Sequence, residues 1–199
     1  MHLIALSSAV PLVVLLAIHA AGARSRAGVI VYGVGLCAML AVSTTYHRWV
    51  HSIASRRRWR RADHATIFAA IAGTGTALAM TSLATGPAIV ALISLWAAAL
   101  AGAVFKLLSF ERAHGLGSAM YVAMGWSALL LAPAIWQRGG PATVLLLAAG
   151  GAVYTLGAIT FARQWPTLRP STFSYHEVWH VFTVVAAGLH FVAVGILAT

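Results

Sequence analysis

The stretch SYHEVWHVFTVVAAGLHFVAVGIL at residues 174–197 decides the fold. It opens on polar residues, among them His176 and His180, and from Val178 onward it holds no Asp, Glu, Lys or Arg. Because an α-helix rises about 1.5 Å per residue, about 20 apolar residues cross the ~30 Å hydrocarbon core of a bilayer. The stretch therefore predicts a transmembrane helix with histidines at its polar start.

The composition extends this prediction to the whole chain. Of the 199 residues, 61% are hydrophobic and only 8% are charged, and the mean hydropathy is +0.88. Soluble globular domains carry about 25% charged residues to cover a wet surface, so a soluble enzyme and a disordered chain are excluded. The single cysteine, Cys37, excludes a disulfide scaffold. The chain is predicted to be an integral membrane protein.

Apolar runs of spanning length alternate with short polar or Gly/Pro segments. We expect an all-α bundle of seven transmembrane helices that forms a single domain over residues 1–199. The first run is expected to remain as a span, because no basic residues precede it as in a signal peptide. The expected spans are about 3–21, 28–50, 65–84, 88–109, 116–136, 142–162 and 174–197.

Basic residues indicate the orientation of this bundle. With seven spans, the loops after spans two, four and six lie on the side of the N-terminus, and they hold ten Lys and Arg against three opposite. Cytoplasmic loops carry the excess of Lys and Arg, so we expect the N-terminus in the cytoplasm and the C-terminus outside. The run RRRWRR at 56–61 is expected to contact anionic lipid headgroups of the cytoplasmic face rather than nucleic acid.

Polar residues gather where three of the spans begin or end. Ser43 and His47 lie at the end of the second span, Asp63 at the start of the third, and His176 and His180 at the start of the seventh. Ionisable groups at such positions are costly and so suggest a function. In the expected topology all three places lie at one depth, near the cytoplasmic surface.

This grouping predicts a metal site. His176 and His180 are four residues apart, so their imidazoles share one helix face and can offer two nitrogens to one zinc ion. His47 would be the third ligand, and three His with one open position is the pattern of catalytic zinc. Bound zinc lowers the pKa of its water to about 7. We expect Asp63 to act as the base and Ser43 to hydrogen-bond a ligand, the water or a substrate oxygen.

These motifs resemble the hemolysin III family, the bacterial branch of the progestin and adiponectin receptor (PAQR) superfamily. The matching residues are Ser-x-x-x-His at 43–47, Asp63, His-x-x-x-His at 176–180, Ile71-Ala72-Gly73-Thr74, Met124-Gly125-Trp126 and Leu189-His190-Phe191. The resemblance implies a seven-helix fold with the N-terminus inside, in the cytoplasmic (inner) membrane of a bacterium. It further implies zinc at His47, His176 and His180, with Asp63 and Ser43 close to the metal-bound water. The superfamily also resembles alkaline ceramidases, which implies hydrolysis of a lipid amide or ester.

Two other interpretations remain open. His176-Glu177-x-x-His180 also fits the H-E-x-x-H pattern of zinc proteases, in which Glu177 would be the base. Alternatively, zinc is structural, and the protein senses or regulates membrane lipid or energy balance without catalysis. A structural site usually has four protein ligands, and the candidates for a fourth are His51 and His64. We expect both of these to face the membrane interface instead.

Overall fold

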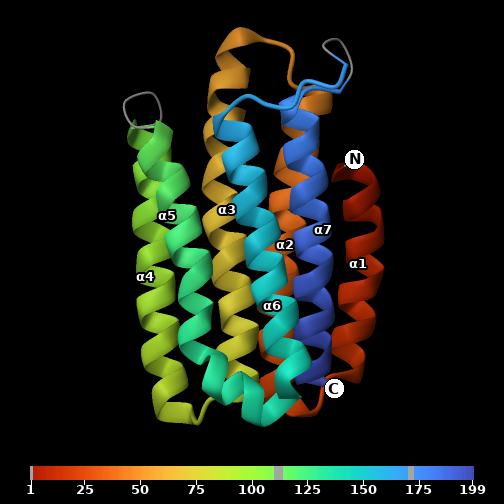
Figure 1. Ribbon diagram of the computed structural model, residues 1–199, viewed down its shortest axis with the longest axis vertical. Helices are drawn as coiled ribbons and strands as arrows, with labels where there is room; N and C mark the ends of the chain where they lie inside the picture. Colours follow the sequence, from red (N-terminus) through yellow and green to blue (C-terminus); the bar gives the residue numbers. More distant parts are fainter. Residues whose placement is uncertain (1, 110–113, 170–172) are drawn as a thin grey trace.

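The computed structural model describes residues 2–109, 114–169 and 173–199, and it shows an up-and-down helical bundle (Figure 1). Arg112, one of the ten basic residues counted above, lies outside these residues. The N-terminus lies near the upper end of the bundle in Figure 1 and the C-terminus at the lower end. The elements are α1 (His2–His19), α2 (Gly22–Trp49), α3 (Ile53–Ser82), α4 (Thr85–Ser109), α5 (His114–Trp126), the 3-10 helix η1 (Ser127–Leu131), α6 (Ala132–Ala162) and α7 (Tyr175–Ala198).

The helices have the length and composition of membrane spans. Six stretches of the described chain are long and apolar enough to cross a bilayer: His2–His19, Gly22–Trp49, Ile53–Ser82, Thr85–Leu108, Leu116–Ala162 and Tyr175–Ala198. The fifth has 47 residues, which is about 70 Å of helix and more than twice the thickness of the hydrocarbon core. Figure 1 shows that it does not run straight, because α5 and α6 lie antiparallel and are joined by a bend at the lower end.

The bend at the lower end has a local cause inside α6. Gly140 has a φ of 73° and a ψ of 179°, which interrupts the helix, and a positive φ is readily adopted only by glycine. Pro141 follows, and proline suits the first position of a helix because it has no N–H to leave unpaired. The expected start of the sixth span at 142 matches this break. The expected continuous span 116–136 is not observed, because α5 gives way to η1 at Ser127.

Other helix ends also differ from the expectation. Helix α3 begins at Ile53 rather than at 65, with Ser52 as its N-cap accepting a hydrogen bond from the Ser55 N–H at 3.3 Å. The arginine run 56–61 is therefore helical, in keeping with the good helix propensity of arginine. The Thr85-Gly86-Pro87 step, expected as a turn, is the first turn of α4. Proline is tolerated there because the first turn lacks internal hydrogen-bond partners.

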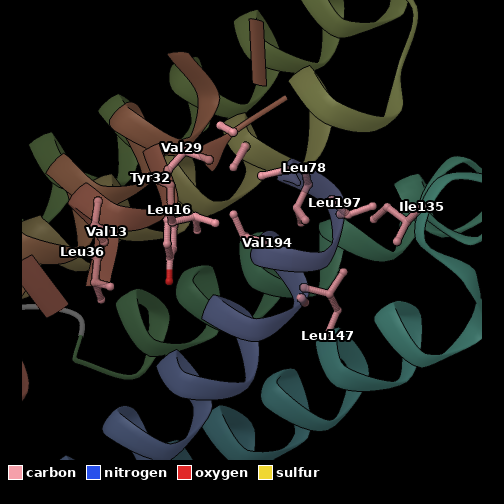
Figure 2. Packing of buried hydrophobic residues seen from close by; sticks show 14 of the residues in the cluster. Val13, Leu16, Val29, Tyr32, Leu36, Leu78, Ile135, Leu147, Val194 and Leu197 are labelled. Carbon is pink, nitrogen blue, oxygen red and sulfur yellow. The ribbon is translucent and has the colours of Figure 1, made fainter. Parts of the chain in front are cut away.

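The core lies between α1, α2, α3, α6 and α7, where Leu16, Val29, Leu78, Leu147 and Val194 pack together (Figure 2). Large apolar side chains also cover the outside of the bundle. Val34, Ile93, Leu145 and Val192 are among those that are half exposed or more. An exposed apolar surface of this extent is unfavourable in water and suits contact with lipid. The fold is therefore that of a helical membrane protein.

Two contacts fix the helices that carry the polar residues. Helices α2 and α3 touch at glycines: a Cβ on Gly35 would lie 2.8 Å from the Ala69 carbonyl oxygen, and one on Gly73 would lie 2.9 Å from that of Val31. At the lower end, the Ala198 carbonyl of α7 accepts hydrogen bonds from the Ala21 N–H at 2.7 Å and the Ser25 hydroxyl at 2.9 Å. The glycine contacts set the distance between α2 and α3, and the hydrogen bonds to Ala198 set the position of α7 along its axis.

Candidate metal centre

The start of α7 is defined by a capping box. The Ser174 hydroxyl accepts a hydrogen bond from the His176 N–H at 3.3 Å, and the Glu177 carboxylate accepts from the Ser174 N–H at 2.7 Å and from its hydroxyl at 2.6 Å. This arrangement fixes the first turn of the helix. His176 and His180 consequently lie one turn apart on one face, with ring centroids 4.6 Å apart.

His47, at the end of α2, joins this pair from the other side. Its Nε2 lies 3.3 Å from Nε2 of His176, and its ring centroid lies 5.0 Å from that of His180. Each of the three residues offers a nitrogen within 4.8 Å of the nitrogens of the other two. His47 is exposed, His176 is intermediate and His180 is the most enclosed. The structure thus brings together the three histidines predicted as ligands.

The chemistry of this group fits a divalent cation. Three neutral imidazoles are a ligand set that zinc takes in proteins, and His-rich sites also accept other divalent ions. Nε2 atoms 3.3 Å apart, on His47 and His176, need a shared proton or a shared cation to avoid repulsion of their lone pairs. Nδ1 of His180 is buried and has no hydrogen-bond partner within residues 2–109, 114–169 and 173–199. Such a nitrogen is costly unless something binds it.

Ser43 and Asp63 lie beside the three histidines and line the same cavity. Ser43 is buried on α2, and its hydroxyl lies close enough to the Asp63 carboxylate on α3 to interact with it. The Asp63 side chain is 15% exposed. Asp63 is not part of the candidate ligand group, which consists of His47, His176 and His180.

The structure adds His2, a residue that the sequence pattern did not indicate. Nδ1 of His2 lies 2.7 Å from the Ser43 hydroxyl oxygen, and its ring makes an edge-on contact with His180 at 4.1 Å between centroids. Nε2 of His2 is buried and makes no hydrogen bond to the described part of the chain. The signal available in the sequence was a histidine at the start of the first apolar run, because that run and 174–197 begin at the same end of the expected bundle.

His51 and His64 do not join the group. His51 is exposed in the turn before α3. Nδ1 of His64 lies 2.9 Å from the Arg60 carbonyl oxygen and 3.8 Å from a carboxylate oxygen of Asp63. Neither residue offers a nitrogen to the set formed by His47, His176 and His180. Among the described residues, the cluster therefore has three nitrogen ligands rather than four.

A long cavity of about 1100 Å³ opens at this cluster. At its upper end it is lined by His2, Ser43, Asp63, His176 and His180. Most of the remaining lining is apolar and comes from α2 to α7, η1 included. Ligand cavities in proteins are typically apolar with a few convergent polar groups, and this cavity has that character.

Comparisons with known proteins place the chain in a family of membrane proteins. A family model described as Haemolysin-III related matches residues 1–191. The chain is 28% identical to Hemolysin-3 of Bacillus cereus, over 93% of this chain and 83% of that protein. It is 29% identical to the human monocyte to macrophage differentiation factor, over 82% of this chain and 67% of that protein. It is 32% identical to the heptahelical transmembrane protein ADIPOR2 of Oryza sativa subsp. japonica, over 84% and 80% of the two chains.

Proposed function

Because the chain belongs to the Haemolysin-III related family, we propose that it is a metal-dependent hydrolase of the membrane that cleaves a lipid amide or ester. The proposal assigns His47, His176 and His180 as zinc ligands and Asp63 and Ser43 as the groups that act on water and substrate. One observation carries it: two of the three clustered imidazoles, those of His176 and His180, line a cavity of about 1100 Å³ together with the Asp63 carboxylate. Such a cavity has room for the acyl chain of a lipid.

We further propose seven crossings, with the N-terminus in the cytoplasm of a bacterial cell. Two observations support this: α5 and α6 run antiparallel (Figure 1), and a relative is named a heptahelical transmembrane protein. The arginine run 56–61 lies at the same end of the bundle as the histidine cluster. Positive residues favour the cytoplasmic side, where they would contact the anionic headgroups of the inner leaflet.

The number of ligands favours a catalytic site over a structural one. Structural zinc sites usually have four protein ligands, whereas catalytic sites keep one position open. Within the described ranges, the cluster offers three nitrogens. Zinc held by these three imidazoles would supply a water molecule that loses a proton near neutral pH.

The residues beside the cluster have defined tasks in this proposal. The Asp63 carboxylate, which lines the cavity beside Ser43, accepts the proton of the attacking water. The water oxygen bonds to the carbonyl carbon of the lipid, and the carbon–nitrogen or carbon–oxygen bond breaks. Asp63 then returns the proton to the leaving amine or alcohol. The products are a fatty acid, whose chain stays in the cavity, and an amine or alcohol.

Glu177 is less suited to act as the base of a protease. Its Oε2 already accepts two hydrogen bonds from Ser174, at 2.7 and 2.6 Å. Both bonds serve the capping box that starts α7. A general base must reach the water that it deprotonates, and this carboxylate oxygen is engaged elsewhere. The engagement supports Asp63 over Glu177 as the base.

Metal content and turnover test the proposal together. Purified protein is expected to hold about one zinc per chain, and His47→Ala and His180→Ala are expected to lose most of it because each removes a ligand. Asp63→Asn is expected to keep the metal and to lower turnover about 10²–10⁴-fold, the usual contribution of a general base. Mass spectrometry of the metal and hydrolysis of lipid amides and esters are the two measurements.

Glu177→Gln is the matched control, with metal and turnover expected within a few-fold of the wild type. If Glu177→Gln is inactive and Asp63→Asn is active, the protease interpretation is correct instead. Bound zinc without turnover on any lipid amide or ester would contradict the hydrolase and favour a regulator of membrane lipid or energy balance.

A further inference from the structure

The cavity that opens at the histidine cluster reaches a second polar level near the middle of the bundle. Its lining there includes Tyr32 from α2, Tyr154 from α6 and His190 from α7. At 1.5 Å per residue, Tyr32 lies about 16 Å from Ser43 along α2, and His190 lies about 15 Å from His180 along α7. Two helices therefore deliver polar side chains to one depth, about 15 Å from the upper end of the cavity.

Tyr32 carries the first observation. The residue is 2% exposed, and its hydroxyl is buried without a hydrogen-bond partner in the portion of the chain that the structure describes. Figure 2 shows the side chain extending inward from α2 with its oxygen at the tip. Burial of a hydroxyl without a partner is unfavourable, and Tyr32 lines the cavity. Its partner is therefore to be sought in the cavity.

His190 carries the second observation. Its Nε2 lies 3.3 Å from the Leu147 carbonyl oxygen, and a carbonyl needs a donor, so the proton of the neutral ring is on Nε2. Nδ1 is then an acceptor. The ring also contacts that of Tyr154, at 5.7 Å between centroids. A Cβ on Gly150 would collide with the His190 ring, so α6 leaves space for this imidazole.

We propose that Tyr32, Tyr154 and His190 form a site for a hydroxyl group on the chain of a bound lipid. A hydroxyl can accept a hydrogen bond from Tyr32 and donate one to Nδ1 of His190, whereas a carbonyl only accepts. A charged group at this depth would be far more costly. The distance of about 15 Å to the histidine cluster corresponds to about twelve carbons of an extended chain at ordinary single-bond lengths. The inference rests on the proposed function only for the position of the lipid head.

The test compares two fatty acids that differ in one hydroxyl, octadecanoic acid and 12-hydroxyoctadecanoic acid. Their affinities for the purified full chain are measured by displacement of a fluorescent fatty acid. The wild type is expected to bind the hydroxy acid about five-fold more tightly, the usual gain from a buried hydrogen bond. Tyr32→Phe is expected to bind the two acids equally. Its melting temperature is expected to be unchanged or higher, because the substitution removes an unpaired hydroxyl.

Tyr175→Phe is the matched control, since Tyr175 does not line the cavity, and it is expected to keep the five-fold preference. Equal affinity of the wild type for the two acids would overturn the inference. So would a preference that survives in Tyr32→Phe. Neither measurement needs turnover. A preference without hydrolysis of any lipid therefore contradicts the hydrolase alone, and hydrolysis without a preference contradicts the hydroxyl site alone.

Discussion

At the scale of single residues, His2 connects the first helix to the candidate metal centre. It contacts His180 edge-on and shares a hydrogen bond of 2.7 Å with the Ser43 hydroxyl, next to Asp63 at the end of the cavity. His2 thereby holds both the His180 ring and the Ser43 hydroxyl. Partners of this kind hold the groups around a metal in place, and their loss typically lowers metal affinity by about 10–100-fold.

His2→Ala is accordingly expected to weaken metal binding about ten-fold. Titration against a chelator and the absorption spectrum of the Co²⁺-loaded protein are the measurements. His2→Asn is expected to restore both, because the side-chain amide of asparagine can donate or accept and so can replace Nδ1 in the hydrogen bond with Ser43. His19→Ala, at the opposite end of α1, is the control and should have no effect. An unchanged affinity and spectrum in His2→Ala would show that His2 only fills space.

The site residues that could be predicted from the sequence are those that lie at a helical spacing from another polar residue. A spacing of four positions, from His176 to His180 or from Ser43 to His47, puts two side chains on one helix face whatever the rest of the fold does. His2 has no partner at such a spacing. Its place beside Ser43 depends on how α1 packs against α2 and α7, which no local pattern records.

At the scale of elements, glycines set how near α2 and α3 lie. A Cβ on Gly73 would come within 2.9 Å of the Val31 carbonyl oxygen, closer than such atoms normally approach. Small residues of this kind allow helix backbones to touch in membranes. Because α2 carries Ser43 and α3 carries Asp63, the same contact sets the distance between these two side chains.

Gly73→Ala is therefore expected to push α2 and α3 apart and to lower the melting temperature by several degrees, as a destabilisation of about 1–3 kcal/mol would. Gly188→Ala is the control, because a Cβ there meets no atom within 4 Å, and its melting temperature is expected to be equal or higher. Thermal unfolding in detergent is the measurement. Equal melting temperatures for the two variants would contradict the close approach.

The helix ends show which elements a sequence can delimit. The break at Gly140-Pro141 agrees with the expected start at 142, since glycine and proline act on the backbone locally. The start of α3 was expected at 65, at the first apolar residues, whereas the helix begins at Ile53. Hydropathy identifies the part of a helix that lies in lipid, and the helix of α3 extends beyond it through the arginine run.

At the scale of the whole molecule, the two ends of the bundle differ in charge. The arginine run 56–61 lies at the upper end, close to the histidine cluster, whereas the turn before α4 at the lower end has no charged residue of its own and is contacted by Arg24 of α2, which donates to the Leu83 carbonyl. An apolar outer surface separates these ends. This asymmetry underlies the proposed orientation, with the metal centre near the cytoplasmic face.

Cysteine labelling tests that orientation. In a Cys37→Ser background, single cysteines are placed at Ala54, near the arginine run, and at Gly86, at the start of α4; both positions are exposed. A maleimide that does not cross membranes is expected to label Gly86→Cys in intact cells, and Ala54→Cys only in inverted vesicles. The background without added cysteine should remain unlabelled. The opposite pattern would contradict the orientation, and labelling of both from one side would contradict the bundle arrangement.

The hydrogen bonds to the Ala198 carbonyl fasten α7 at the end remote from its histidine pair. Ala21 and Ser25 both donate to this one oxygen, so α7 cannot slide along its axis without breaking two bonds. One residue inserted between His190 and Ala198 would turn the histidine pair about 100° and shift it by about 1.5 Å, away from His47. The hydrogen bonds to Ala198 at the opposite end of the bundle therefore set the position of both imidazoles, through the number of residues between Ala198 and the histidine pair.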